Sequence, residues 1–95
     1  MTTPTHNRPV SFDLSREEAW VLHAALTRAV DRALDADETP RYAQSLVLQV
    51  EAGETAFGAT ALRYLADVLA THLEDAPERD EAVAATLLSR IRDAV

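Results

Sequence analysis

Apolar and polar residues follow a helical period over most of the chain, and the longest such stretch covers Ser15 to Ala36. Its apolar residues recur every three or four positions, which places them on one face of a helix. Ser15 and Glu18 have the spacing of a capping box, in which each side chain accepts a hydrogen bond from the other residue's backbone N–H. Trp20 falls on the opposite face. The predicted inward face comprises Ala19, Leu22, Ala25, Leu26, Ala29, Val30 and Ala33.

A second helix is predicted from Pro40 to Ala52, with Thr39 as its N-cap and Gly53 as the residue that ends it. The alternative is a strand from Ser45 to Glu51, whose apolar residues also alternate, folding back onto Thr55–Phe57. We favour the helix because its start and stop signals are complete and its interior lacks turn residues. Its inward face would hold Tyr42, Ala43, Leu46, Val47 and Val50.

Two further helices are predicted in the second half of the chain. The third begins after the N-cap Gly58 and runs to about Asp75, and the fourth covers Glu81 to Ala94 behind the N-cap Asp80. A proline-containing turn, Ala76–Arg79, joins them. Their inward faces would hold Ala61, Leu62, Leu65, Val68, Leu69 and Leu73 in the third helix, and Val83, Ala84, Leu87, Leu88, Ile91 and Val95 in the fourth.

The N-terminal segment, residues 1–9, is polar, and we expect it to be flexible. Val10, Phe12 and Leu14 then alternate with polar residues, which predicts a short strand. Thr55–Phe57 is a second extended candidate. We expect the two to pair as a short two-stranded β ribbon beside the helices.

The two halves of the predicted domain correspond to each other. Adding 43 to the residue numbers maps most of the first apolar face onto the third, and adding 41 maps the second onto the fourth, with caps Thr39 and Asp80 aligned. The competing explanation is that any two amphipathic helix pairs can be slid into apolar register. We favour a mainly α fold, a four-helix bundle of two pseudo-symmetric strand-helix-turn-helix repeats, about residues 10–52 and 53–95 of a single domain.

Composition narrows the class of protein. The 95 residues suit one domain, and the absence of cysteine excludes disulfides, thiolate nucleophiles and cysteine-based zinc sites. No apolar run is long enough to span a membrane, and the N-terminus lacks the apolar core of a signal peptide. We therefore expect a soluble cytoplasmic protein with no membrane partner.

The charge balance is the most unusual feature of the composition. Sixteen acidic residues oppose nine basic ones, giving a net charge of −7, and all nine are arginine. Such a surface repels the phosphates of nucleic acids. An acidic, lysine-free chain suits molar salt, where the Debye length is about 3 Å and repulsion between carboxylates is screened. The composition therefore predicts a halophilic protein.

Three segments carry a family resemblance: LSREEAWVLHAAL, EAGETAF leading into ALRYLADVL, and DAPERD. Over residues 12–95 the chain resembles a small haloarchaeal family of unknown function. The resemblance implies no active site, ligand or partner. Gly58 stands where a threonine-type cap would be expected, a departure that concerns only the strength of that cap.

Four residues are candidates for a functional role. Trp20, Ala24 and Leu48 lie off the predicted inward faces, and an aromatic anchor in an apolar patch is typical of a surface that binds a protein partner or a second copy. In the alternative interpretation, Trp20 packs beneath the N-terminal strand. His72 is a candidate polar site on the apolar face of the third helix, although a metal site would need converging ligands.

Motifs for other chemistries are missing. The acidic residues around the third turn lack the spacing of a calcium loop, and no phosphate loop or nucleophile motif occurs, so we expect no cofactor. The leading hypothesis is a non-catalytic protein interaction or regulatory module. One alternative is a small enzyme or metal-binding protein. The other is a helix-turn-helix-like nucleic-acid-binding regulator, whose basic patch would comprise Arg28, Arg32, Arg41, Arg90 and Arg92.

Overall fold

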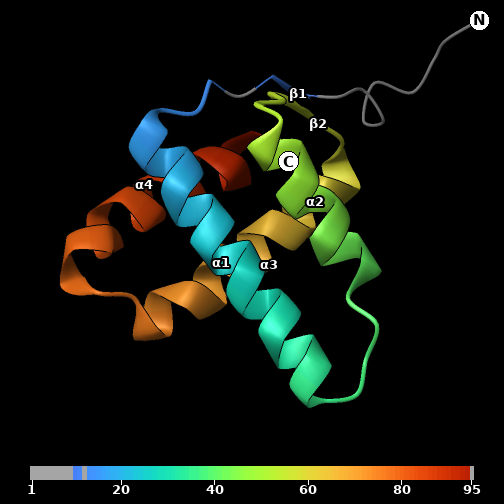
Figure 1. The fold of residues 1–95 in the computed structure, drawn as a ribbon. Helices are drawn as coiled ribbons and strands as arrows, with labels where there is room; N and C mark the ends of the chain where they lie inside the picture. The colour runs from blue at the N-terminus through green and yellow to red at the C-terminus, as the bar shows by residue number, and fades with distance from the viewer. Residues whose placement is uncertain (1–9, 12, 95) are drawn as a thin grey trace, which may run out of the picture.

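Four helices and a two-stranded sheet form the part of the chain that the computed structural model describes, residues 10–11 and 13–94 (Figure 1). The predictions for residues 1–9, Phe12 and Val95 lie outside these described residues. In chain order the elements are β1 (Val10–Ser11), α1 (Arg16–Asp35), α2 (Arg41–Glu51), β2 (Ala56–Phe57), α3 (Ala59–Asp75) and α4 (Glu78–Ala94).

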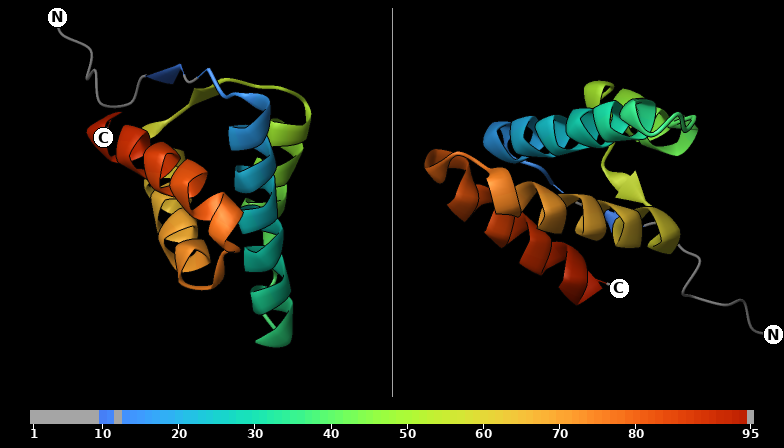
Figure 2. Two further views of the ribbon diagram at one scale, coloured as in Figure 1. Left: turned by 90° about the vertical axis from the view of Figure 1, so that its left-hand side faces the viewer. Right: turned by 90° about the horizontal axis from the view of Figure 1, so that it is seen from below.

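The helices stack as two layers, with α1 and α2 in one and α3 and α4 in the other (Figure 2). Helix α1 contacts all three other helices. The core lies between the layers, and its fully buried large side chains are Val21, Leu22, Leu26, Leu46, Leu62, Leu65, Leu69, Leu87 and Ile91. The sequence therefore predicted the helical bundle and most of its core correctly.

Strands β1 and β2 pair antiparallel, with Val10 opposite Phe57 and Ser11 opposite Ala56. This confirms the predicted ribbon. Phe57 is buried in the core, so the ribbon is tied to the helices through that side chain.

Helix α1 begins as predicted. The Glu18 N–H donates to Ser15 Oγ at 3.0 Å, and the Ser15 N–H donates to Glu18 Oε1 at 2.9 Å, which completes the capping box. Its buried face is narrower than predicted and includes Val21, which was not among the predicted inward residues. The C-terminal end of α1 extends past α3 and α4 (Figure 2), so Ala29, Val30 and Ala33 are only half-buried.

Helix α2 confirms the helical interpretation of residues 41–51, and the alternative strand is wrong. The predicted cap is wrong too. Pro40 is the N-cap, no side chain caps the helix, and the Arg41 N–H donates to the Thr39 carbonyl at 2.9 Å. Tyr42 was predicted to point inward, but it is 44% exposed and packs edge-on against Tyr64, with ring centroids 5.0 Å apart. A side chain in the first turn of α2 lies beside the core rather than over it.

Helix α2 ends at Glu51, and Gly53 follows its C-cap Ala52 as predicted. Gly53 has a φ of 77°, and the N–H groups of Gly53 and Glu54 donate to the carbonyls of Val50 and Gln49, which forms a Schellman motif. Helix α1 ends in the same way with Asp37, at a φ of 58°, in the left-handed position. Both turns thus satisfy the last carbonyls of a helix within the backbone.

Helix α4 begins at Glu78, three residues before the predicted start, so Asp80 is not its N-cap. The connection after α3 is reduced to Ala76 and Pro77. Proline tolerates a position at the start of a helix because it has no N–H to satisfy there. Glu78, Asp80 and Glu81 occupy the first turn, where carboxylates interact favourably with the helix dipole.

Candidate interaction surface

Trp20 on α1 and Leu48 on α2 are the most exposed large apolar side chains of the described residues. Trp20 is 68% exposed and Leu48 is 65% exposed. The interpretation that Trp20 packs beneath the N-terminal strand is therefore wrong. The capping box places Trp20 in a regular turn of helix, so the indole is presented by a rigid element rather than by a loop. Ala24, the third predicted member of the surface, is half-buried.

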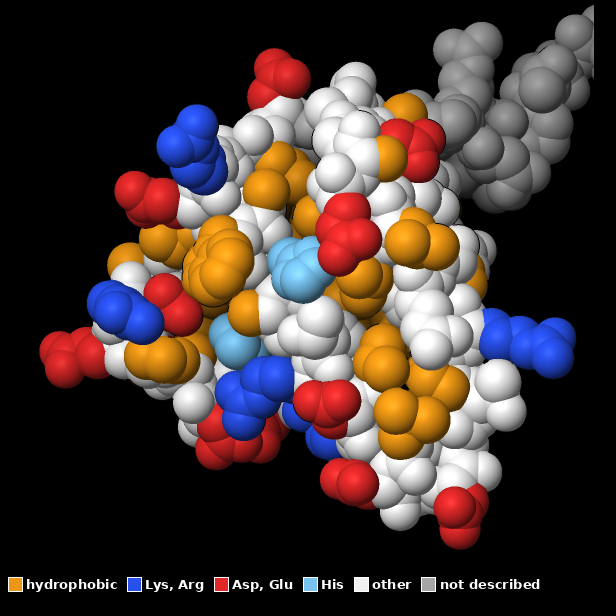
Figure 3. Space-filling model, in the orientation of Figure 1, with side chains coloured by type: hydrophobic (Ala, Val, Ile, Leu, Met, Phe, Trp, Pro, Cys, Tyr) orange, Lys and Arg blue, Asp and Glu red, His pale blue; other side chains and the backbone are white. Residues whose placement is uncertain are grey.

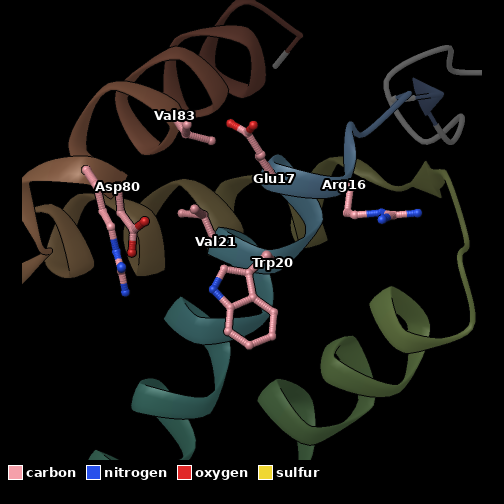
Figure 4. Close-up of a pocket in the computed structure, with 7 residues that line it drawn as sticks. Arg16, Glu17, Trp20, Val21, Asp80 and Val83 are labelled. Atoms are coloured by element: carbon pink, nitrogen blue, oxygen red, sulfur yellow. The ribbon is translucent and has the colours of Figure 1, made fainter.

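A hollow of about 430 Å³ lies beside Trp20, between the first turns of α1 and α4, and we call it the Trp20 hollow (Figure 4). Val21 and Val83 supply apolar surface on its two sides. Figure 4 shows Trp20 and Val21 on one helix facing Asp80 and Val83 on the other, with Arg16 pointing away from α4. The lining residues are Arg16, Glu17, Trp20, Val21, Arg79, Asp80 and Val83.

Sequence reasoning missed the α4 side of this hollow. Arg79 was predicted to lie in a turn and Asp80 to be the N-cap, whereas both lie in the first turn of α4. A usable signal was present, because Pro77 is followed at once by an acidic residue, an arrangement typical of a helix start.

An ion pair beside the hollow fixes α1 against α4. Arg90 Nη1 donates to Glu18 Oε2 at 2.6 Å, and Arg90 Nη2 donates to the Asp13 carbonyl at 3.3 Å. Burial tends to raise the pKa of Glu18, but the hydrogen bonds from Ser15 and Arg90 outweigh it and the pKa is lowered. Glu18 therefore serves both the cap of α1 and the contact with α4.

Leu48 borders a different hollow, of about 450 Å³, between α1 and α2, which we call the Leu48 hollow. It begins about 10 Å along α1 from Trp20, because seven residues separate Trp20 from Thr27. Figure 3 shows apolar side chains in separate patches on this face of the molecule, with polar and charged side chains between them. The lining residues are Thr27, Val30, Asp31, Gln44, Val47 and Leu48.

The structure therefore divides the predicted surface in two. Trp20 and Leu48 line no common hollow, and Ala24 lines neither of these two. Both hollows lie along α1, which makes this helix the element that carries the candidate surface.

His72, the other candidate, is 3% exposed, the only polar residue among the buried ones that the structure describes. Arg28 Nη1 lies 3.4 Å from His72 Nδ1. Because a guanidinium only donates, Nδ1 must accept and the ring proton of the neutral imidazole must be on Nε2. Nε2 is buried and has no hydrogen-bond partner among the described residues. His72 thus joins α3 to α1 but lines neither the Trp20 hollow nor the Leu48 hollow.

The charges around His72 oppose its protonation. Burial has the largest effect and lowers the pKa of His72, and the nearby guanidinium groups of Arg28 and Arg32 lower it further. The carboxylates of Asp80 and Asp75 act in the opposite direction without reversing the shift. We call these five side chains the His72 network. A neutral imidazole beside Arg28 is a packing and hydrogen-bonding group in this state.

The metal site and the basic patch considered from the sequence can be compared with the structure. Across residues 10–11 and 13–94, no group of three or more His, Cys, Asp or Glu side chains is arranged to hold a metal ion. Arg28 lies 3.6 Å from Asp75, whereas Arg90 pairs with Glu18, about 15 Å along α1 from Arg28. These two arginines therefore do not share one basic patch.

Comparison with known proteins identifies a family. A model of a family of unknown function, DUF7853, matches residues 12–92. The chain belongs to this family. No curated protein and no solved structure matches the chain. A search of the described helices for one both long and apolar enough to cross a membrane finds none.

Proposed function

We propose that this member of DUF7853 is a non-catalytic protein interaction or regulatory module that acts through the outer face of α1. One observation carries the proposal: Trp20 and Leu48 are two-thirds exposed beside hollows of about 430 and 450 Å³ on that helix. Large apolar side chains next to concave apolar surface are the usual anchors of protein interfaces.

The polar groups give less support to an enzyme. Catalysis needs titratable groups that converge on an open pocket. His72, the buried histidine, is enclosed between α1 and α3. The side chains around the Trp20 hollow are charged, but they surround an apolar space.

Capture from an extract of the source organism at molar salt tests the interaction. We expect the wild-type chain to retain a specific protein and at least one of the variants Trp20→Glu and Leu48→Glu to lose it. Leu34→Glu is the matched control, because Leu34 is also exposed on α1, at 56%, but lines neither hollow. Equal capture by all four chains would contradict the proposal, and recovery of nucleic acid would favour the helix-turn-helix alternative.

We also propose that the protein works in a halophilic cytoplasm. The support is its composition, with a net charge of −7 and arginine as the only strongly basic residue type. Below about 0.5 M salt, repulsion between carboxylates is less screened, so we expect the helical circular dichroism signal to fall. Cooperative unfolding of an intact helical fold in dilute buffer would overturn this part of the proposal.

The internal duplication is a further proposal about the origin of this module. Its support is that several residues related by the two offsets are buried in both halves. The aligned residues Thr39 and Asp80 do not cap their helices and give the duplication no support. Equivalent roles predict that Leu26→Ala and Leu69→Ala lower the free energy of unfolding by similar amounts, about 2–5 kcal/mol. Urea unfolding measures both, and strongly unequal losses would count against the duplication. The buried leucine pairs are Leu22 and Leu65, Leu26 and Leu69, Leu46 and Leu87.

A further inference from the structure

The Trp20 hollow has a projecting group and a recess next to each other. The indole stands out from α1 at 68% exposure, and the space beside it, bounded by Val21 and Val83, measures about 430 Å³. Pockets of this size take a whole small ligand, so an indole can enter it. A two-fold axis at such a patch would insert each indole into the recess of the other copy, because a two-fold interface uses the same patch on both subunits.

The charges of this patch are balanced on a molecule that is otherwise strongly acidic. The hollow is lined by two arginines, Arg16 and Arg79, and two acidic residues, Glu17 and Asp80. Two copies that meet here bring no net charge together, although each carries −7 overall. A mixed set of this kind can set arginine against carboxylate across a two-fold axis.

The Leu48 hollow lacks this self-complementarity. Its only charged lining residue is Asp31. A second copy docked there would bring carboxylate against carboxylate, which is unfavourable. The charge pattern therefore distinguishes the two hollows and favours the Trp20 hollow for self-association.

We propose that the occupant of the Trp20 hollow is a second copy of this chain, in a two-fold dimer in which the two Trp20 side chains are exchanged. This inference rests on the proposed function, since it names the partner of one of the two hollows. The Leu48 hollow stays open in such a dimer and is available to a different protein.

Trp20 is the sole tryptophan of the chain, so intrinsic fluorescence reports on this site directly. We expect the tryptophan emission to move to shorter wavelength as the protein is concentrated from micromolar to millimolar in molar KCl. The sedimentation coefficient should rise over the same range, because burial of the indole and dimer formation are one event. A monomer at every concentration, or a dimer whose tryptophan emission stays that of an exposed indole, would overturn the proposal.

Three variants complete the test. Trp20→Glu and Val83→Arg should weaken self-association at least about tenfold, as expected for an anchor and for the recess that receives it. Leu34→Glu, the matched control, should associate like wild type. Circular dichroism checks that each variant folds. If a variant does not fold, the concentration series of the wild-type chain decides whether the dimer exists.

The capture experiment separates this inference from the proposed function. A wild-type chain that stays monomeric but still binds a foreign protein through Trp20 would overturn the dimer and leave the interaction module standing. If the chain forms a dimer but neither wild type nor Leu48→Glu captures another protein, the result would support a second copy as the occupant of the Trp20 hollow. It would also contradict the proposal of a foreign protein partner.

Discussion

The Trp20 hollow and the His72 network depart in opposite directions from the usual distribution of side chains. In the first, a large apolar side chain of α1 is left in water. In the second, an imidazole is enclosed, and its Nε2 has no hydrogen-bond partner within residues 10–11 and 13–94. Exposed apolar surface costs the folded chain little, whereas a buried polar group without a partner costs about 1–3 kcal/mol. The two regions therefore differ in expected role: exposure suits Trp20 to the proposed association, whereas burial ties His72 to stability and its dependence on pH.

The largest effect is expected from truncation inside the His72 network. His72→Ala should lower the free energy of unfolding by about 1–3 kcal/mol, because the cavity it leaves outweighs the relief of removing an unpaired donor. Urea unfolding in molar salt at neutral pH measures this. His72→Leu, which keeps most of the volume, should stay within about 1.5 kcal/mol of wild type. If His72→Ala left the free energy of unfolding unchanged, the His72 network would contribute no more to stability than the surface around Trp20.

The next largest effect is expected from acidification, which should lower the free energy of unfolding through His72 and not through Trp20. The pKa of His72 in the folded chain lies below its ordinary value of 6.5, so between these two values only the unfolded chain binds the proton. Stability is therefore fully retained above about pH 6.5 and falls below it, by at most about 1.4 kcal/mol per pH unit. Urea unfolding at a series of pH values in constant salt follows this loss.

Two histidine variants control the pH experiment. His72→Leu should abolish the loss between neutral pH and the lowered pKa, and His23→Leu, at a part-exposed histidine that contacts Glu51, should retain it. If both variants kept the wild-type slope, the titrating group would have to lie outside the His72 network.

These effects indicate how far the sequence could be used to predict the fold. Helix faces and the capping box are properties of short segments, and the sequence pattern predicts them. The pairing of β1 with β2 joins segments distant in the sequence, and it was expected because each half of the chain begins with one short extended segment. The errors at Thr39, Tyr42 and Asp80 concern the first turns of α2 and α4. At those places a proline sets the helix start, and packing between layers decides which side is covered.

The candidate site was predictable only in part. Periodicity placed Trp20 and Leu48 off the inward faces, which the structure confirms. It could not place the first turn of α4 opposite Trp20, nor Arg28 beside His72, because both contacts join segments distant in the sequence. Contacts between distant segments decide whether a residue outside the predicted inward face is buried or stays exposed to water.

The ion pairs of the two regions give a smaller contrast. Glu18 is only 13% exposed and lies 2.6 Å from Arg90, whereas Asp75 is 71% exposed and lies 3.6 Å from Arg28. A double-mutant cycle with Glu18→Gln and Arg90→Gln should give a coupling of about 1 kcal/mol. The matched cycle with Arg28→Gln and Asp75→Asn should give less than about 0.5 kcal/mol.

Acid also tests the Glu18 pair. The pKa of Glu18 is lowered in the folded chain, so its contribution is present above about pH 4.5 and is lost as the pH falls below that value. The coupling measured at neutral pH should therefore shrink at low pH. Equal coupling energies in the two cycles at neutral pH would show that the ion pair between Glu18 and Arg90 is no stronger than an exposed surface ion pair.

The smallest effect on stability is expected at Trp20 itself. In dilute protein, Trp20→Ser should change the free energy of unfolding by no more than about 0.5 kcal/mol, because the indole is 68% exposed and loses little packing. The matched substitution Leu34→Ser should behave in the same way. At high protein concentration the two should diverge, since dimer formation stabilises the folded wild-type and Leu34→Ser chains by mass action but not Trp20→Ser. Thermal unfolding at both concentrations measures this, and a large loss for Trp20→Ser in dilute protein would make Trp20 a structural residue like His72.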